Sequence, residues 1–430
     1  MKVFFIIALL LLNLVQVFSQ KPEEIYKQEL IDLDQQEDFG AYVNWRELFY
    51  YYPGKKDTSL ISDLDKRKKI VIAPDGSIFM SHKNIHEIWK FDKDGNLIKK
   101  FGSKGSKPGQ FIYLPNVEGI LDDKYLITSD NQGRLNIFDL NGNFIKLLKI
   151  DYMPLAIAPL KNGKMAILGH VSWSNSQART LLRIIDFNTG IEKEIFNKAN
   201  TNVVAMNIKF PHGGGMSNSI SYAHPMAWRI RISSSKEKNL ITASPETGEV
   251  IEYDPYGKLL NSFKLTITPL QITDQDINDQ YEQALKKSET FEKSVVRKIA
   301  ESDSVIRKRK WTEKEIQEVI ESYKKQVENF RDRKFYPQLL PYFSSMVIDS
   351  DGNLLFFQYT KDYNPTGNKF SAYAYDMKGR FIGTSSFRND YFDISYTPST
   401  FQFYNGFVYA VAGKKNNVDI MEIVKMKVEE

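Results

Sequence analysis

The residues best suited to chemistry are three histidines that fall in or beside long interruptions of an otherwise regular chain. His212 and His224 lie in the segment 210–225, which contains three successive glycines at 213–215, and His170 begins another long loop. Three imidazoles brought together could bind a metal ion, and one imidazole could act as a general acid or base. Their spacing matches no established ligand motif, so histidines that are simply solvated in loops are the competing interpretation.

Four further side chains fall in loops that we expect at the same end of the molecule. These candidate ligand-binding residues are Asp130, Arg134, Trp173 and Tyr363. Tryptophan and tyrosine offer a flat apolar surface with a polar tip, which suits a peptide or a sugar ring. Successive glycines would let the backbone approach such a ligand closely. With the three histidines, these residues form a seven-residue candidate ligand site.

The structural elements that must position these side chains are encoded by a short sequence repeat. An aromatic residue, an Asp, two free positions, a Gly and an apolar run recur in residues 91–101, 138–147, 253–263 and 375–384. An Asp side chain can cap a tight turn, and Gly tolerates the positive φ that the turn needs. Each copy therefore predicts two antiparallel strands joined by a hairpin. A unit that recurs in this way cannot bury its apolar face alone.

The strand-length runs around these hairpins predict units of four antiparallel strands, of which the first starts at Lys69. Six units can be followed, and the sixth, which begins at Thr400, shows only three strands. A spare strand in the N-terminal leader can complete it. Sheets arranged radially and closed in this way leave few open edges. The sequence therefore predicts an all-β fold, a six-bladed β-propeller closed by an N-terminal strand.

A glycine-rich segment between the first two units supports this architecture. Residues 102–111 read GSKGSKPGQF, and the second unit continues with Ser129-Asp130, Gly133-Arg134-Leu135 and Phe138-Asp139. Here the chain resembles the NHL-repeat propellers, whose repeats are joined by a G-x-x-G-x-x-x-G-x-F segment of this spacing. The resemblance is specific over residues 74–150 and looser afterwards. The later segments 336–341 and 347–352 look like exported bacterial six-bladed propellers of uncharacterised role.

Other site motifs are absent or weak. The glycines of residues 102–109 lack the Lys-Ser/Thr ending of a phosphate-binding loop and precede a strand, which favours a linker between blades. The G-x-S-x-G, H-E-x-x-H and EF-hand patterns do not occur. Asn116 and Glu118 could join a calcium site like that of gluconolactonase-like propellers. Single carboxylates near a channel are common, so this pair carries little weight.

The largest interruption of the repeat, residues 273–333, has the pattern of helices. Apolar residues fall on two stripes at helical spacing, and Thr312 with Glu315 forms a capping-box signature. The sequence predicts a two-helix insertion between blades 4 and 5. Residues 286–310 contain nine Lys or Arg against four Asp or Glu. A solvated helix surface explains this excess, and a site for an anionic partner is the alternative.

The N-terminus has the pattern of an export signal. Lys2 precedes an apolar run, and small or tolerated residues follow up to Ser19, which predicts a signal peptide over residues 1–19. An uncleaved anchor is the competing interpretation, although the run is shorter than a membrane span needs. The predicted domains are this signal, a leader with the closing strand at 20–67, and the propeller at 68–430. We expect a periplasmic or extracellular protein with no transmembrane segment after signal cleavage.

Composition narrows the classes of function. The chain has no Cys, which rules out disulfides and thiolate metal sites, and its formal charge of +5 on 430 residues argues against a nucleic-acid partner. The first hypothesis is a propeller that binds or scaffolds a peptide, glycan or partner protein on its loop rim, with no cofactor. The alternative is a metal-dependent hydrolase or lyase of the lactonase-like or amidating-lyase-like type, with calcium or zinc.

Overall fold

A computed structural model describes the backbone of most of the chain from residue 69 onward and of two short N-terminal strands. The described residues are 15–18, 23–29, 69–81, 86–130, 133–171, 179–199, 204–211, 215–220, 230–290, 296–306, 310–358, 369–388, 392–394, 401–414 and 417–427. Within them, no helix is both long and apolar enough to cross a membrane.

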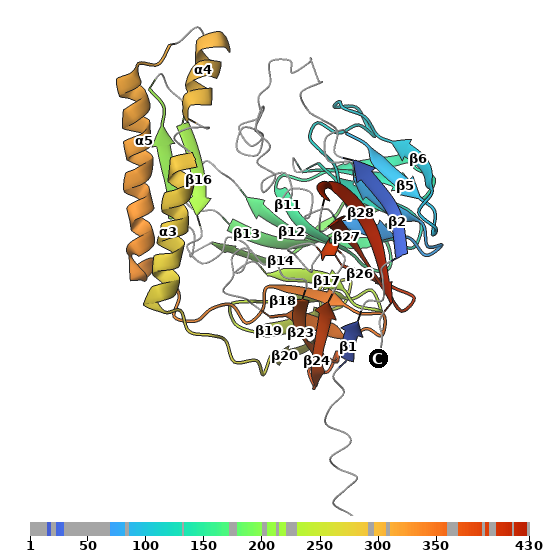
Figure 1. The fold of residues 1–430 in the computed structure, drawn as a ribbon. Helices are drawn as coiled ribbons and strands as arrows, with labels where there is room; N and C mark the ends of the chain where they lie inside the picture. The colour runs from blue at the N-terminus through green and yellow to red at the C-terminus, as the bar shows by residue number, and fades with distance from the viewer. Residues whose placement is uncertain are drawn as a thin grey trace, which may run out of the picture.

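Five consecutive antiparallel sheets follow the order of the chain (Figure 1). Sheet 1 contains β3 (Ile70–Ile72), β4 (Ile78–Ser81), β5 (Ile88–Phe91) and β6 (Leu97–Phe101). Sheet 2 contains β7 (Asn116–Leu121), β8 (Tyr125–Ser129), β9 (Arg134–Asp139) and β10 (Phe144–Lys149). Sheet 3 contains β11 (Met153–Pro159), β12 (Lys164–Val171), β13 (Arg179–Asp186) and β14 (Glu192–Ala199). Sheet 4 contains β17 (Arg231–Ser234), β18 (Leu240–Ala243), β19 (Glu249–Tyr253) and β20 (Leu259–Lys264). Sheet 5 contains β21 (Ser345–Ile348), β22 (Leu354–Phe357), β23 (Lys369–Tyr375) and β24 (Phe381–Arg388).

The two ends of the chain meet in one further sheet, sheet 6. It contains β25 (Phe392–Ile394), β26 (Gln402–Tyr404), β27 (Phe407–Lys414) and β28 (Asn417–Lys427). The N-terminal strand β2 (Glu23–Glu29) pairs antiparallel with β28 as its outermost strand. A second N-terminal strand, β1 (Val15–Phe18), pairs parallel with β24 at the edge of sheet 5. The leader also contains a β-capable piece, residues 58–64, which lies outside the described residues.

The predicted hairpins are confirmed in atomic detail. In sheet 2 the Asp139 Oδ1 accepts from the backbone N–H groups of Asn141 at 2.9 Å and Asn143 at 2.8 Å, and Gly142 has a φ of 77°. Desolvation alone would raise the pKa of Asp139, but these hydrogen bonds outweigh it and lower the pKa. Asp92, Asp254 and Asp376 make the equivalent bonds. The turn chemistry is local, which is why four sequence segments sufficed to predict it.

The apolar core lies between neighbouring sheets. Phe101 of sheet 1 packs on Phe138 of sheet 2 with ring centroids 5.0 Å apart, and similar clusters join sheets 2 to 3, 3 to 4 and 4 to 5. The ring centroid of Phe357 in sheet 5 lies 5.8 Å from that of Phe401, which precedes β26 of sheet 6. Tyr409 of sheet 6 is buried in the core of sheet 1. The innermost strands also touch in sequence, from β26 to β3, β7, β11, β17 and β21. These contacts confirm the all-β propeller fold.

The apolar run that follows each turn is more exposed than the repeat suggested. Leu97 and Ile98 are 43% and 56% exposed, and the equivalent Leu259–Leu260 and Phe381–Ile382 pairs are exposed to a similar degree. These residues begin the outermost strands, where neighbouring sheets diverge from the centre. The geometry of a radial array, rather than the local pattern, leaves them partly in solvent.

Side chains of the outermost strands link each sheet to the next. The Lys99 Nζ donates to the backbone oxygen of Asn141 at 2.7 Å, and Lys146 donates to Phe187 at 2.7 Å. Lys193 donates to Tyr256 at 2.6 Å, and the Asn261 side-chain amide donates to Met377 at 2.8 Å. Each acceptor lies in or beside the hairpin turn of the following sheet. We call these four bonds the inter-sheet clasps.

Removing three clasps together should measurably loosen the ring. We expect the triple variant Lys99→Met, Lys146→Met, Lys193→Met to lose about 1.5–3 kcal/mol of unfolding free energy, since each exposed bond contributes about 0.5–1 kcal/mol and the sites are well separated. Urea denaturation measures the loss. Lys149→Met, at an exposed lysine farther along β10, is the control and should change stability by less than the triple variant; equal losses would contradict the clasp interpretation.

The two interruptions of the repeat pack against each other on one side of the sheets (Figure 1). The described part of residues 273–333 contains three α-helices where the sequence predicts two: α3 (Asp274–Thr290), α4 (Arg297–Ile306) and α5 (Glu313–Val327). Two apolar clusters explain why there are three helices instead of two. One cluster joins α3 to the end of α5, and the other joins α4 to the start of α5. The predicted capping box of Thr312 and Glu315 is present.

The shorter interruption forms a two-stranded ribbon, β15 (Val204–Lys209) and β16 (Gly215–Ile220). Phe210, which follows β15, lies against Trp311 before α5 with ring centroids 5.5 Å apart, and both side chains are buried. Helix α5 also contacts β15. We call α3, α4, α5 and this ribbon the insertion layer. Sequence reasoning identified both interruptions but not the contact between them. The contacting residues, Phe210 and Trp311, are about a hundred positions apart in the chain.

Candidate functional site

The first candidate site lies where the innermost strands of sheets 1 and 2 begin. Lys69 precedes β3, Glu118 lies in β7 and Ser129 ends β8. The Lys69 Nζ donates to the backbone oxygen of Glu118 and lies 4.0 Å from its carboxylate. The Ser129 hydroxyl donates to the Glu118 Oε1 at 2.7 Å. The strand order places all three groups at the same end of the innermost strands.

Burial moves the pKa values of the two charged groups toward each other. Desolvation raises the pKa of the Glu118 carboxyl, and the Lys69 charge and the Ser129 hydroxyl oppose part of that rise. Desolvation likewise lowers the pKa of the Lys69 ammonium, against the attraction of Glu118. A lysine and a carboxyl perturbed in opposite directions can exchange a proton with a bound group, which makes the pair a candidate site. The same geometry also ties sheet 1 to sheet 2.

Single and double variants of Lys69 and Glu118 should show how much the interaction between their charges contributes to the unfolding free energy. Lys69→Met should lose about 1–3 kcal/mol of unfolding free energy, because it leaves the Glu118 carboxylate partly buried without its counter-charge. Lys69→Met with Glu118→Gln should recover most of the loss. Urea denaturation of the two variants and the wild type measures the effect. A double variant no more stable than the single one would show that the charges do not interact.

The pH dependence of the pair has a definite sign. The raised folded-state pKa of Glu118 makes the wild type lose stability as pH rises through the carboxyl range, and the lowered pKa of Lys69 restores stability as pH approaches the lysine range. The unfolding free energy of the wild type, minus that of the double variant, should therefore pass through a minimum near neutral pH. Denaturation series between about pH 4 and pH 10 measure this difference. A difference that is constant with pH would contradict the assigned shifts.

Asp130 and Arg134, two of the predicted ligand-binding residues, meet in sheet 2. Asp130 is fully buried, and its Oδ2 lies 3.3 Å from the Arg134 Nε. The same oxygen accepts from the Ile112 N–H at 3.3 Å, and an Arg134 terminal nitrogen donates to the backbone oxygen of Ser106 at 2.9 Å. These bonds hold the linker between sheets 1 and 2 onto sheet 2. The role of this pair in ligand binding stays a prediction.

Asn136 completes this linker attachment and was missed by sequence reasoning. Its side-chain oxygen accepts from the Gly109 N–H at 3.0 Å, and its amide donates to the backbone oxygen of Gln110 at 3.0 Å. The Phe111 side chain beyond them is fully buried between the two sheets. A polar residue at a buried position of a strand was the signal that could have identified Asn136. The linker interpretation of the glycine-rich segment agrees with these contacts.

His170 is the one predicted histidine among the described residues. It lies near the end of β12, paired with Met153 on one side and Thr180 on the other, and is partly exposed. Trp173, His212, His224 and Tyr363 lie outside the described residues. Whether His170, His212 and His224 converge therefore stays a prediction. In the described ranges, no group of three or more His, Asp or Glu could hold a metal ion.

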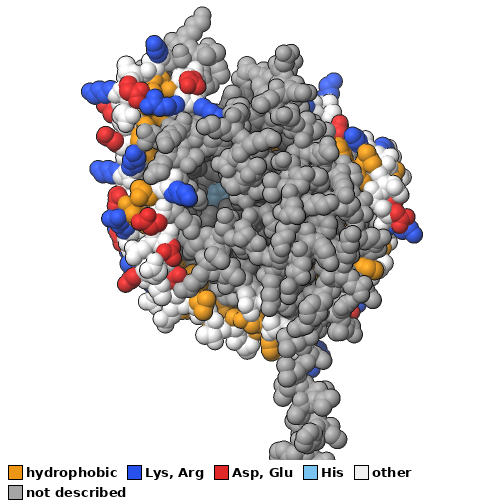
Figure 2. Space-filling model, viewed as in Figure 1, with side chains coloured by type: hydrophobic (Ala, Val, Ile, Leu, Met, Phe, Trp, Pro, Cys, Tyr) orange, Lys and Arg blue, Asp and Glu red, His pale blue; other side chains and the backbone are white. Residues whose placement is uncertain are grey.

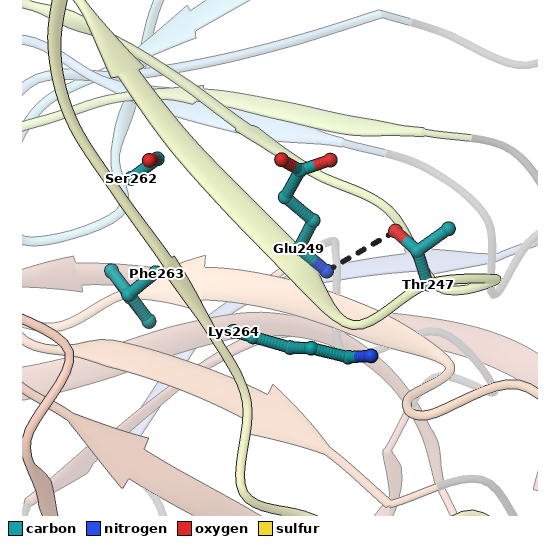
Figure 3. Close-up of a pocket in the computed structure, with 5 residues that line it drawn as sticks. All are labelled: Thr247, Glu249, Ser262, Phe263 and Lys264. Carbon is teal, nitrogen blue, oxygen red and sulfur yellow. Dashed lines mark hydrogen bonds between the residues drawn. The ribbon is translucent and has the colours of Figure 1, made fainter.

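A surface hollow of about 430 Å³ lies on sheet 4, away from these residues (Figure 3). Its lining residues are Thr247, Glu249, Ser262, Phe263 and Lys264. Glu249 and Lys264 are directly opposed on β19 and β20, and the Thr247 hydroxyl accepts from the Glu249 N–H at 3.3 Å. All but Phe263 are exposed. The hollow is open and lacks buried polar groups, so we do not assign it a ligand.

The insertion layer presents a broad charged surface. Blue and red side chains are interspersed over its outer face (Figure 2). Arg297 pairs with Glu313 at 2.8 Å, and the Tyr281 hydroxyl donates to Glu328 at 2.7 Å. Of the basic bend at residues 307–310, only Lys310 is described, and it is exposed. The described part of this surface mixes both signs of charge.

Comparison with known proteins supports the propeller. Residues 55–243 match the DUF5128 family, described as a 6-bladed beta-propeller. No curated protein matches the sequence. The match confirms the resemblance to six-bladed bacterial propellers over the first part of the chain and ends before the helices of the insertion layer.

Solved structures with a similar arrangement are distant in sequence. A DUF4221 family member from Bacteroides vulgatus is 13% identical, covers 84% of this chain and 93% of its own, and has a TM-score of 0.43. A presumed exported protein from Bacteroides fragilis is 12% identical, covers 88% and 93%, and has a TM-score of 0.44. Virginiamycin B lyase from Staphylococcus aureus is 11% identical, covers 85% and 97%, and has a TM-score of 0.37.

Proposed function

We propose that this chain is an exported propeller that binds or scaffolds a peptide, glycan or partner protein at its loop rim. The observation that carries the proposal is the insertion layer. Two departures from the repeat, far apart in sequence, fold into one structure with its own apolar core, joined by Phe210 and Trp311. A repeat array needs no such layer to be stable, so its presence points to a surface kept for recognition.

The order of the strands supports a position of the layer at the same end as the rim. The ribbon interrupts the connection from β14 to β17, and the helices interrupt the connection from β20 to β21. Both connections run from the outermost strand of one sheet to the innermost strand of the next. In an up-and-down sheet these connections share an end with the loops between second and third strands. Those loops hold the predicted ligand residues Asp130, Trp173 and Tyr363. The connection from β14 to β17 holds His212 and His224, and His170 and Arg134 lie at the ends of strands beside the loops.

We propose further that the six sheets are the blades of one closed ring. The family description, the chain of contacts between innermost strands and the burial of Tyr409 in the core of sheet 1 support six blades. The pairing of β2 with β28 supports closure by an N-terminal strand. Export rests on the signal pattern of residues 1–19, and a periplasmic or extracellular location follows from it.

The binding function needs no cofactor, whereas the alternative metal-dependent hydrolase or lyase does. Elemental analysis of the purified mature protein and its thermal melting with added calcium or zinc distinguish the two. For a binding propeller we expect neither a stoichiometric metal nor a metal-dependent rise in melting temperature. A bound ion whose removal lowers the melting temperature would favour the metalloenzyme.

Site-specific photo-crosslinking in the producing cell tests the binding function. A crosslinking residue at Glu246, in the rim turn of sheet 4, or at Lys310, in the insertion layer, should capture the same partner polypeptide. The control is Lys93, which is exposed in a hairpin turn at the opposite end of sheet 1. A glycan array with the mature protein covers a carbohydrate ligand. Equal capture from all three positions, or no capture and no glycan binding, would refute the proposal.

A further inference from the structure

The outermost strand of sheet 5 carries little charge. Strands β6, β10 and β14 carry lysines within their length, in the sequences LIKKF, FIKLLK and EKEIFNKA. Strands β20 and β24 read LLNSFK and FIGTSSFR, and the one charged residue of each is its last, Lys264 or Arg388. Charged side chains, lysine above all, are a common device that keeps an exposed strand edge from pairing with another chain. Among these five edges, β20 and β24 have the least of this protection.

Of these two weakly protected edges, β24 is the one that gains a strand. Residues 15–18 (β1) run parallel to β24, with Val15 opposite Ser385 and Phe18 opposite Arg388 (Figure 1). In the sheet topology, β6, β10, β14 and β20 each end their sheet. Strand β1 falls within the predicted signal peptide, so the mature protein would lose this partner. Signal cleavage would leave the hydrogen-bonding edge of β24 open.

We propose that in the mature protein this edge binds an extended segment of a partner polypeptide, which adds to sheet 5 as a strand parallel to β24. Strand addition of this kind takes its affinity from backbone hydrogen bonds and its selectivity from alternate side chains. The partner segment is uncharged and mostly apolar, as VQVF in β1 is. A segment longer than β1 would also reach Phe381 and Ile382, which are 51% and 50% exposed at the start of β24. This site lies on the circumference of the propeller and is separate from the proposed rim site.

The test uses the mature protein starting at Gln20 and a fluorescent peptide of residues 13–20, NLVQVFSQ. Fluorescence anisotropy should show saturable binding. Thr384→Lys places a charge on the edge and should weaken binding at least tenfold. Ser262→Lys is the matched control, since Ser262 on β20 and Thr384 on β24 each lie five residues after their turn glycine. Thermal melting of both variants checks that each is folded.

Backbone methylation of the peptide distinguishes strand addition from side-chain docking. One peptide is N-methylated at Val15 and Val17, and another at Gln16 and Phe18. Because only alternate N–H groups face the neighbouring strand, one peptide should lose binding and the other should retain it. Absence of binding, equal binding of both peptides, or no effect of Thr384→Lys would overturn the proposal. A concentration-dependent dimer of the mature protein that Thr384→Lys abolishes would assign the edge to a second copy and also overturn it.

Discussion

Replacing Trp311 with alanine is expected to unfold the insertion layer while the sheets stay folded. Trp311 is 5% exposed and belongs to a cluster with Phe210, Val296 and Ile299 of the same layer. Truncating a buried tryptophan to alanine costs about 3–5 kcal/mol, because apolar contact is lost and a cavity remains. This cluster contains no residue of sheets 1 to 6. The substitution should therefore lower the free energy of local unfolding of the layer and leave that of the sheets unchanged.

Hydrogen exchange followed by mass spectrometry measures this effect by segment. In Trp311→Ala, protection should fall in α4, α5 and β15 and stay unchanged in β7 to β10. Lys310→Ala, the neighbouring exposed position, is the control and should leave every segment as in the wild type. If the proposed function is right, the variant also loses photo-crosslinking from the layer. Uniform loss of protection across the sheets would show instead that the layer and the propeller fold as one unit.

Replacing Asp130 with alanine should destabilise the whole propeller by about 3–5 kcal/mol. The change leaves the Arg134 side chain, which is 10% exposed, without its partner carboxylate. Breaking a buried ion pair by removing one partner carries a cost of this size, because the remaining charge is uncompensated. The Ile112 N–H also loses its acceptor. The linker at 103–111 should lose its attachment to sheet 2.

Urea denaturation gives the free-energy change, and hydrogen exchange over residues 103–111 shows the release of the linker. Asp94→Ala, at an exposed turn position of sheet 1, is the control and should stay within about 0.5 kcal/mol of the wild type. The double variant Asp130→Ala, Arg134→Met should recover part of the loss. Native stability of Asp130→Ala together with loss of ligand binding would return Asp130 and Arg134 to the ligand site that the sequence predicts.

Local chemistry is what the sequence determined by itself. The turn at Asp139 and Gly142, the capping box at Thr312 and the order of strands in sheets 1 to 5 all depend on residues a few positions apart. Short-range hydrogen bonds and backbone preferences fix such features in any context. For this reason the hairpins and the propeller fold could be read from the repeat alone.

The tertiary structure alone decided which of these residues meet. Lys99 and Asn141 are 42 positions apart, Lys193 and Tyr256 are 63 apart, and nothing near either lysine in sequence specifies its acceptor. Asp130 and Arg134 were predicted as rim residues; the structure places them under the linker as a buried ion pair, and their role in ligand binding stays a prediction. The contact between Phe210 and Trp311 likewise exists only because the chain returns to the same end of sheet 4. Long-range contacts depend on how whole sheets pack against one another, and a local pattern carries no record of that packing.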